Sequence, residues 1–220
     1  MKGIGWRSIA LSGGVLLAGA FAFDRLTWGF DAFTAEAARQ QAVLAQPAAV
    51  PLVAGHDQTG RVLALTDDPL GTGPGRIAIV DFVYTRCTTL CSALGASYQR
   101  LQAQIVAAHL QDRVRLVTVS FDPEHDTPAV IANYAQRMHA DPTVWTVLTL
   151  SNPADLPVLL HTFGVVVIPA PMEQFQHNAA LHLVDAQGWL VQIMDIDQPG
   201  AALAEALRRA ATPRTAGGTS

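Results

Sequence analysis

Two cysteines four positions apart, Cys87 and Cys91, occupy the junction between a predicted strand and a predicted helix. The residues from Ile77 to Tyr84 form an unbroken apolar run rich in β-branched and aromatic side chains, which is typical of a strand buried on both faces. Beyond the cysteines, apolar side chains recur at steps of three and four residues as far as Ala108, which predicts an amphipathic helix. A buried strand that leads directly into a core-facing helix favours an α/β layer architecture.

The remainder of the chain continues this alternation of strands and helices. We predict a hairpin within residues 52–65, strands at 114–121 and 145–150, helices at 128–139 and 153–163, a pair of strands at 179–184 and 189–193, and a final helix at 201–211. A Pro-rich loop is expected through Pro169 and Pro171. This order predicts a thioredoxin-like α/β sandwich with an N-terminal hairpin, although periodicity alone also fits other small α/β folds.

The N-terminus carries the pattern of a targeting segment. Lys2 and Arg7 precede an apolar run from Ile9 to Phe23, and acidic residues begin only at Asp24. This order predicts a positively charged cytoplasmic flank and export of everything downstream. The aromatic side chains within residues 28–33 favour an uncleaved membrane anchor, whereas the small residues around position 21 leave a cleavable signal open.

Length and composition fit one globular unit behind this segment. A chain of 220 residues is long enough for one well-buried domain but short for two independent cores. Half of the residues are hydrophobic and 15% are charged, which argues against a disordered chain, and a net charge of −4 offers no basic surface for nucleic acid. We expect an anchor or signal segment at 1–32, a linker at 33–50, a globular domain at 51–212 and a disordered tail at 213–220.

The cysteine pair predicts chemistry rather than a structural crosslink. A disulfide between residues so close in sequence closes a very short loop and restrains the unfolded chain little. On a helix, residues at i and i+4 share one face, so both sulfurs can contact one ion. The helix N-terminus lowers thiol pKa values, and Arg86 adds positive charge. Thiolates select Cu(I), zinc or iron–sulfur clusters, and two cysteines need a further ligand from elsewhere. The alternative of two incidental core cysteines is disfavoured by their position at the junction.

Several motifs together resemble the Sco/SenC family. The segment from Asp81 to Cys91 resembles the family signature of a strand, a Thr-x-Cys turn and a second cysteine four positions on. Residues 120–128 and 133–135, and a histidine eleven positions before Gly188, fit the same pattern in order. The resemblance covers roughly residues 51–211. It implies a thioredoxin-like copper-binding domain, copper held by Cys87, Cys91 and His177, and a role in assembling the copper centre of cytochrome c oxidase.

One position departs from the family pattern. Family members usually carry proline directly after the second cysteine, whereas this chain has Ser92. Proline would fix the backbone at the start of the helix, so the change bears on the rigidity of the turn and on the thiol pKa values. It removes no ligand.

Among the seven histidines, His177 is the predicted ligand. It matches the family motif and lies on a predicted loop before the strand at 179–184, from which it could fold over the cysteine turn. His182 points to the opposite face of that strand and is expected to pack in the core. The other five are expected at the surface, in loops or at helix ends: His56, His109, His125, His139 and His161. Asp126 is expected to cap the following helix, and Asp122 to face the site or a partner.

Two functions follow from the resemblance and the cysteine pair. The first is a copper chaperone, not an enzyme, that delivers Cu(I) to the copper-bearing subunit of cytochrome c oxidase; binding of Cu(II) is left open. The second is a thiol–disulfide oxidoreductase that uses Cys87 and Cys91 to reduce that subunit or to sense redox state. A peroxidase needs only one activated thiolate and explains the pair less well. Further expected partners are other copper chaperones or thioredoxin-like reductants, with the domain facing the periplasm from the bacterial inner membrane.

Overall fold

The computed structural model describes residues 6–27, 34–66, 76–87 and 90–211, with residues 6–10, 26 and 90–93 described by their backbone alone. The chain divides into two compact units, Met1–Ala45 and Gln46–Ser220. The first unit contains α1 (Trp6–Leu26) and α2 (Ala35–Ala45). Within the described parts of the chain, no helix is both long enough and apolar enough to cross a membrane. The aromatic residues at 28–33 and the predicted tail at 213–220 lie outside the described residues.

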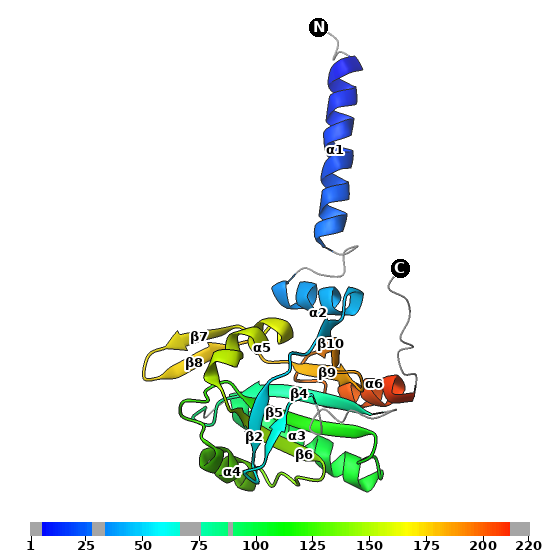
Figure 1. Cartoon of the computed structure of the whole chain (residues 1–220). Helices are drawn as coiled ribbons and strands as arrows, with labels where there is room; N and C mark the ends of the chain where they lie inside the picture. The colour runs from blue at the N-terminus through cyan, green and yellow to red at the C-terminus, as the bar shows by residue number, and fades with distance from the viewer. Residues whose placement is uncertain (1–5, 28–33, 67–75, 88–89, 212–220) are drawn as a thin grey trace. The chain divides into compact units, whose positions relative to one another are not determined.

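The second unit is built on an eight-stranded sheet with the order β1-β10-β9-β4-β5-β6-β2-β3 (Figure 1). β4 pairs in parallel with β5 and antiparallel with β9, so it lies inside the sheet, and every residue of it is buried. This confirms the strand predicted from its unbroken apolar run. The strands of the sheet are β1 (Ala48–Ala49), β2 (Ala54–Asp57), β3 (Val62–Ala64), β4 (Ile77–Val83), β5 (Val114–Ser120), β6 (Trp145–Leu150), β9 (Leu181–Asp185) and β10 (Trp189–Met194).

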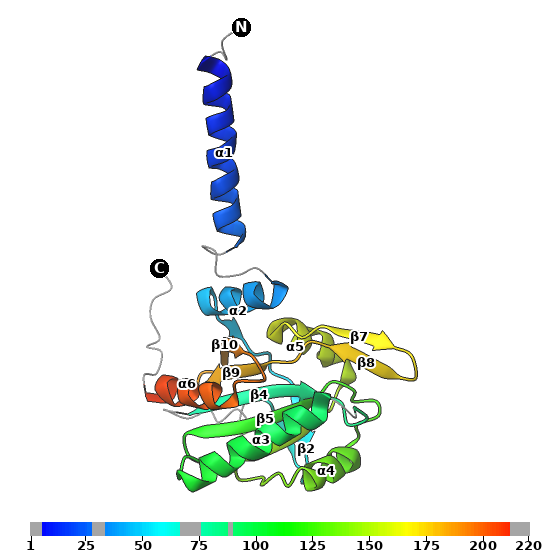
Figure 2. The ribbon, with the colours of Figure 1, turned by 180° about the vertical axis from the view of Figure 1, so that it is seen from behind.

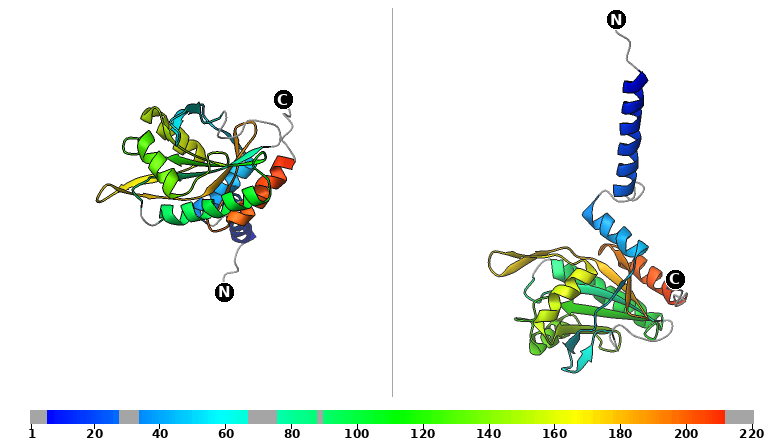
Figure 3. Two further views of the ribbon diagram at one scale, coloured as in Figure 1. Left: turned by 90° about the horizontal axis from the view of Figure 1, so that it is seen from below. Right: turned by 45° about the horizontal axis from the view of Figure 1, so that its top comes forward.

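Helices cover both faces of this sheet, as the predicted sandwich requires. α3, α4 and α6 lie on one face (Figure 2), where Gln99 of α3 donates to the carbonyl of Met138 at the end of α4, and α5 lies on the other (Figure 3). Tyr98 of α3 packs against Trp145 in the core of the first layer, and Phe163 of α5 packs against Phe82 in the second. The helices are α3 (Leu90–Ala107), α4 (Pro128–Arg137), the 3₁₀ turn η1 (Pro153–Asp155), α5 (Leu156–Phe163) and α6 (Pro199–Ala211).

A separate two-stranded sheet occupies the region predicted to be a Pro-rich loop. β7 (Val167–Ala170) and β8 (Gln174–His177) pair antiparallel and extend away from the main sheet (Figure 1). Pro169 is tolerated because a two-stranded ribbon has only edge strands, where a residue without an N–H need not break a ladder. The expectation of a loop was therefore wrong here, and His177 is the last residue of a strand rather than a loop residue.

Candidate metal centre

The turn that carries Cys87, residues Tyr84 to Cys87, is called the cysteine turn and begins where β4 ends. Tyr84 is buried, and Thr85, Arg86 and Cys87 are half-buried. The Cys87 N–H donates to the Tyr84 carbonyl over 3.2 Å, which closes a tight turn ahead of α3. Cys91 is the second residue of α3, but Cys87 precedes the helix. The expectation that both cysteines share one helical face was therefore wrong for Cys87, whose sulfur is carried by the turn. The Cys91 side chain lies outside the described residues.

Asp126 fixes this turn from the β5–α4 loop. Its carboxylate is fully buried and accepts hydrogen bonds from the Thr85 N–H at 3.0 Å and the Thr85 hydroxyl at 2.5 Å. The Ser120 hydroxyl at the end of β5 donates to the same carboxylate at 2.5 Å. The expected role of Asp126 as a helix cap was wrong, because Thr127 takes the N-cap position of α4 and makes no side-chain capping bond. The carboxylate instead ties the end of β4 to the end of β5.

Arg86, directly before Cys87, bridges two other segments. One guanidinium nitrogen donates to the Asp122 carboxylate at 2.9 Å, and the other donates to Glu173 at 2.6 Å. His125 adds to this cluster, with Nδ1 at 2.9 Å from Asp122 and 3.3 Å from Arg86. The hydrogen bond to Asp122 is the main reason that the pKa of Arg86 lies above its ordinary value. Two carboxylates therefore balance the positive charge that Arg86 was expected to add beside the thiols.

His177 lies against the same turn. Its ring packs on Phe121 at 4.9 Å and on Tyr84 at 6.3 Å between ring centroids. Nδ1 is 3.0 Å from the Asn178 carbonyl, and because a carbonyl can only accept, Nδ1 carries the hydrogen. Nε2 is buried and makes no hydrogen bond. Burial lowers the pKa of His177, partly opposed by the bond to the Asn178 carbonyl. The imidazole is therefore held neutral, with an unused lone pair on Nε2.

Three aromatic rings form an apolar cluster beside this imidazole, and two of them, Tyr84 and Phe121, contact it. Tyr84, Phe121 and Phe175 pack on one another with centroid separations of 5.2 to 5.7 Å. They lie at the end of β4, just after β5 and within β8, so three segments distant in sequence meet here. Sequence reasoning missed this cluster, although Phe175 stands two positions before His177 and so shares its face of the strand. An apolar wall of this kind excludes water from a metal–ligand bond.

The structure thus places His177 against Tyr84, the residue that begins the turn carrying Cys87. Within the described side chains, no three histidine, cysteine or acidic groups converge as a complete metal site, and the Cys91 sulfur is not among those side chains. His182 is buried, with Nδ1 at 3.1 Å from the Val80 carbonyl and its ring against Phe82 and Phe163, which confirms its packing role. His109, His125, His139 and His161 are exposed as expected, whereas His56 is half-buried in β2.

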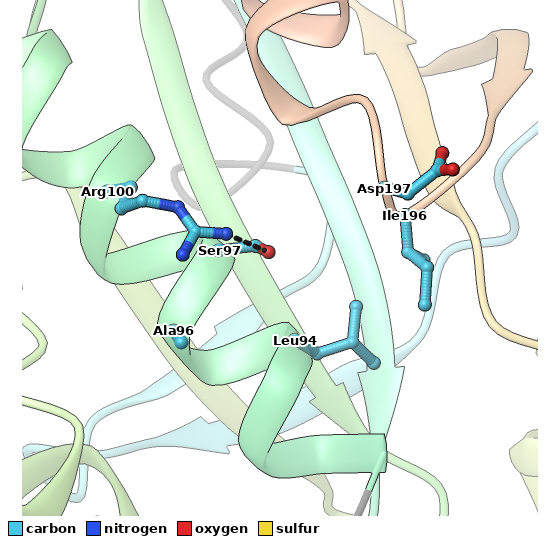
Figure 4. A pocket seen from close by; sticks show the side chains of 6 residues that line it. All are labelled: Leu94, Ala96, Ser97, Arg100, Ile196 and Asp197. Atoms are coloured by element: carbon cyan, nitrogen blue, oxygen red, sulfur yellow. Dashed lines mark hydrogen bonds between the residues drawn. The ribbon is translucent and has the colours of Figure 1, made fainter.

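A pocket of about 270 Å³ lies elsewhere, between α3 and the loop from β10 to α6 (Figure 4). Arg100 donates to Ser97 on its α3 side, and Asp197 stands on the loop side. None of its lining residues belongs to the cysteine turn or to the β7–β8 hairpin. It is therefore a separate feature from the His177 site.

Comparison with known sequences is consistent with this geometry. The sequence profile described as SCO1/SenC matches residues 71–212. A SCO1 protein homolog from Bacillus subtilis is 28% identical over 116 residues, which is 52% of this chain and 59% of that protein. The match therefore spans less than two thirds of the relative's length.

Three solved structures share the fold. A SCO1/SenC family lipoprotein from Bacillus anthracis gives a TM-score of 0.65 at 23% identity, covering 76% of this chain and 99% of that one. BsSco, described with a disulfide switch and as a member of the Sco family of cytochrome c oxidase assembly proteins, gives 0.64 at 21% identity, covering 76% and 96%. ScoI from Bradyrhizobium japonicum with copper bound gives 0.56 at 25% identity, covering 73% and 99%. Because the family profile matches well over half of the sequence, the chain belongs to the SCO1/SenC family.

Proposed function

We propose that this protein binds Cu(I) through Cys87, Cys91 and His177 and delivers it to the copper-bearing subunit of cytochrome c oxidase. The observation that carries the proposal is the state of His177 beside the cysteine turn. Its Nε2 is buried, makes no hydrogen bond and belongs to a neutral ring, so it keeps the lone pair that a metal needs. A buried acceptor without a partner is unfavourable in a metal-free protein, and a metal bond would satisfy it.

Copper fits this donor set better than the other soft metals. Two thiolates and one imidazole would leave a tetrahedral zinc site to be completed by water, and they cannot hold an iron–sulfur cluster with cysteine alone. Cu(I) favours soft thiolate ligands. With three ligands it stays open to an incoming donor, so it can pass to a partner by ligand exchange. The copper-bound ScoI and the oxidase-assembly role given for BsSco support this assignment.

X-ray absorption of the full-length protein loaded with Cu(I) tests the ligand set. The wild type is expected to bind one copper with two sulfur ligands and one nitrogen ligand. His177→Ala should lose the nitrogen and bind copper more weakly. His161→Ala is the matched control, because His161 is an exposed residue of α5 outside the site. A wild type that binds no Cu(I), or a His177→Ala variant with unchanged affinity and spectrum, would contradict the proposal.

A thiol–disulfide oxidoreductase is the second candidate. It is supported by the half-buried Cys87 at a turn and by the disulfide switch described for BsSco. In such a reaction one thiolate attacks a partner disulfide and the second releases the partner by forming the Cys87–Cys91 bond, so two electrons pass to the partner. His177 separates the two functions. Its substitution should abolish the nitrogen ligand to copper but leave the rate of dithiol exchange nearly unchanged.

The proposed function also requires the second unit to face the periplasm. The basic residues that precede the N-terminal apolar run support export, and the relative from Bacillus anthracis is described as a lipoprotein. Protease added to intact spheroplasts is expected to digest residues 46–220, whereas a cytoplasmic marker protein survives. Survival of the second unit until the membrane is lysed would contradict this placement.

A further inference from the structure

The hairpin that carries His177 is held against the cysteine turn by Arg86 and Tyr84. Arg86 donates to Glu173 at 2.6 Å. The Tyr84 hydroxyl donates to the Gln174 side chain at 3.0 Å and accepts from the Phe175 N–H at 3.4 Å. Glu173, Gln174 and Phe175 are consecutive and lead into the strand that ends at His177. The turn around Cys87 therefore contacts three successive residues of the segment that presents the imidazole.

The position of the Arg86 guanidinium is itself fixed. Its second nitrogen donates to Asp122 at 2.9 Å, and that buried carboxylate lies two residues after the end of β5. The Asp122 N–H donates to the Ser120 hydroxyl at 3.1 Å, which anchors the residue to the end of the strand. Because a guanidinium is planar and rigid, fixing one edge of it fixes the direction in which the other edge donates. Arg86 thus offers a donor to the hairpin at a defined place.

The backbone conformation at the tip of the hairpin is unfavourable by itself. Met172 and Glu173 have φ values of 61° and 54°, a left-handed conformation that residues other than glycine adopt with strain. The turn is closed by a long backbone bond of 3.4 Å from the Gln174 N–H to the Pro171 carbonyl. Strained backbone persists where surrounding contacts hold it. The ion pair of Glu173 with Arg86 is such a contact.

We propose that Arg86 is a positioning residue for His177 and acts through Glu173. The ion pair keeps the β7–β8 hairpin in the arrangement that presents the imidazole to the cysteine turn. When the pair opens, the hairpin moves outward and copper remains on the two thiolates, where an incoming donor can take it. The inference rests on the proposed function, since it assigns Arg86 and Glu173 to control of the same copper site. Neither residue is itself a ligand.

Glu173→Gln in the full-length protein tests this with two measurements. The first is amide hydrogen exchange of residues 174–177 in the metal-free protein. The second is the rate at which excess chromophoric chelator removes Cu(I), alongside the sulfur and nitrogen count by X-ray absorption. Loss of an ion pair of this kind is expected to raise both rates by about fivefold. Arg86→Gln should raise both rates at least as much, because it also loses the ion pair with Asp122, and adding Glu173→Gln to it should raise them no further, since the partner of Glu173 is already gone.

Two variants serve as controls. Arg86→Lys keeps the positive charge but cannot reach both carboxylates at once. It should therefore raise the exchange rate and the rate of copper removal less than Arg86→Gln does. Glu205→Gln removes ion pairs with Arg208 and Arg209 within α6, away from the hairpin, and should leave both rates at the wild-type value.

Each outcome decides the inference. Unchanged hairpin exchange in Glu173→Gln means that the ion pair does not hold the hairpin, and the inference is wrong even if copper binds as proposed. Raised exchange with an unchanged rate of copper removal means that the hairpin moves without affecting the ligand, which also overturns it. A wild type that binds copper without nitrogen defeats the proposed function, and the spectrum shows this separately from the exchange data.

Discussion

The cysteine turn is held from two sides, and the two anchors differ in chemistry. On one side Asp126 is fully buried and accepts hydrogen bonds from Thr85 and Ser120. On the other side the Glu173 side chain is 76% exposed and pairs with Arg86. In a buried network no water can replace a lost hydrogen-bond partner. In an exposed ion pair, water can solvate either group when the pair opens. The difference teaches that the Asp126 anchor fixes the position of the turn, whereas the Arg86–Glu173 anchor can open. The proposed copper transfer would use both anchors, because in it the thiols stay placed while the imidazole leaves.

Asp126→Ala should produce the largest effect on stability. Three donors, the Thr85 N–H and the hydroxyls of Thr85 and Ser120, would lose their acceptor at a buried position. A loss of about 5 kcal/mol in the free energy of unfolding is expected, at the upper end for single substitutions. Urea denaturation measures it. Asp126→Asn, which keeps one acceptor oxygen, should lose less, and a loss below about 1.5 kcal/mol in the alanine variant would mean that this anchor is not rigid.

Asp81 extends the comparison, because it is another buried carboxyl and lies within β4. Its Oδ1 has no hydrogen-bond partner, and burial raises its pKa from 3.8 to about 7, against the opposing effect of hydrogen bonds with Thr118 and Tyr98. The folded state therefore keeps a proton that the unfolded chain releases above pH 3.8. The contribution of this proton to the free energy of unfolding is fully present below pH 3.8. It is lost as the pH rises to about 7 and amounts to about 4 kcal/mol in total.

Asp81→Asn should remove this pH dependence, because an amide does not ionise. Above pH 7 the variant is expected to be more stable than the wild type, whereas near pH 4 the advantage should vanish. Free energies of unfolding measured between pH 4 and 8 for both proteins give the difference curve, from which other titrating groups cancel. Parallel curves for the two proteins would show that Asp81 is ionised in the folded state.

The sequence predicts the scaffold of the site better than the contacts that complete it. The apolar run of β4 and the three- and four-residue spacing of α3 are local patterns, and both elements form with nearly the predicted bounds. The β7–β8 hairpin was missed because Pro169 and Pro171 dominate the local pattern. Its pairing depends on edge strands that local sequence does not reveal.

The roles of the charged residues were hidden for a related reason. Asp126 precedes Thr-Pro and looks like a helix cap, yet its donors come from residues 6 and 41 positions away. Arg86 looks like a free charge beside a cysteine, yet one of its partners lies 87 positions further along the chain. His177 was predicted from the family motif, but the aromatic wall that keeps its ring neutral is formed by three separate segments.

Phe175→Ala tests how much the packing of aromatic rings, rather than the Arg86–Glu173 ion pair, holds the hairpin against the cysteine turn. Phe175 is half-buried against Tyr84 and Phe121, so its truncation should cost about 2 kcal/mol, less than for a fully buried phenylalanine. Opening this side of the wall should also move the pKa of His177 back up towards its ordinary value, because burial is what lowers it. Thermal unfolding and the NMR titration of the His177 ring measure the two effects. Phe175→Leu, which keeps apolar bulk, should show less of each; an unchanged ring pKa in Phe175→Ala would assign the shift to the other two rings.

Met172→Gly should give the smallest effect and the opposite sign. Met172 is 87% exposed and has a φ of 61°, so glycine loses little burial there and relieves left-handed strain. The hairpin should gain up to about 1 kcal/mol, reduced by the greater flexibility of glycine in the unfolded chain. Amide exchange of residues 174–177 should slow accordingly, and Met172→Ala, which keeps the strain, should not slow it. Faster exchange in the glycine variant would show that the methionine side chain stabilises the tip, and the exposed anchor would then extend beyond Glu173.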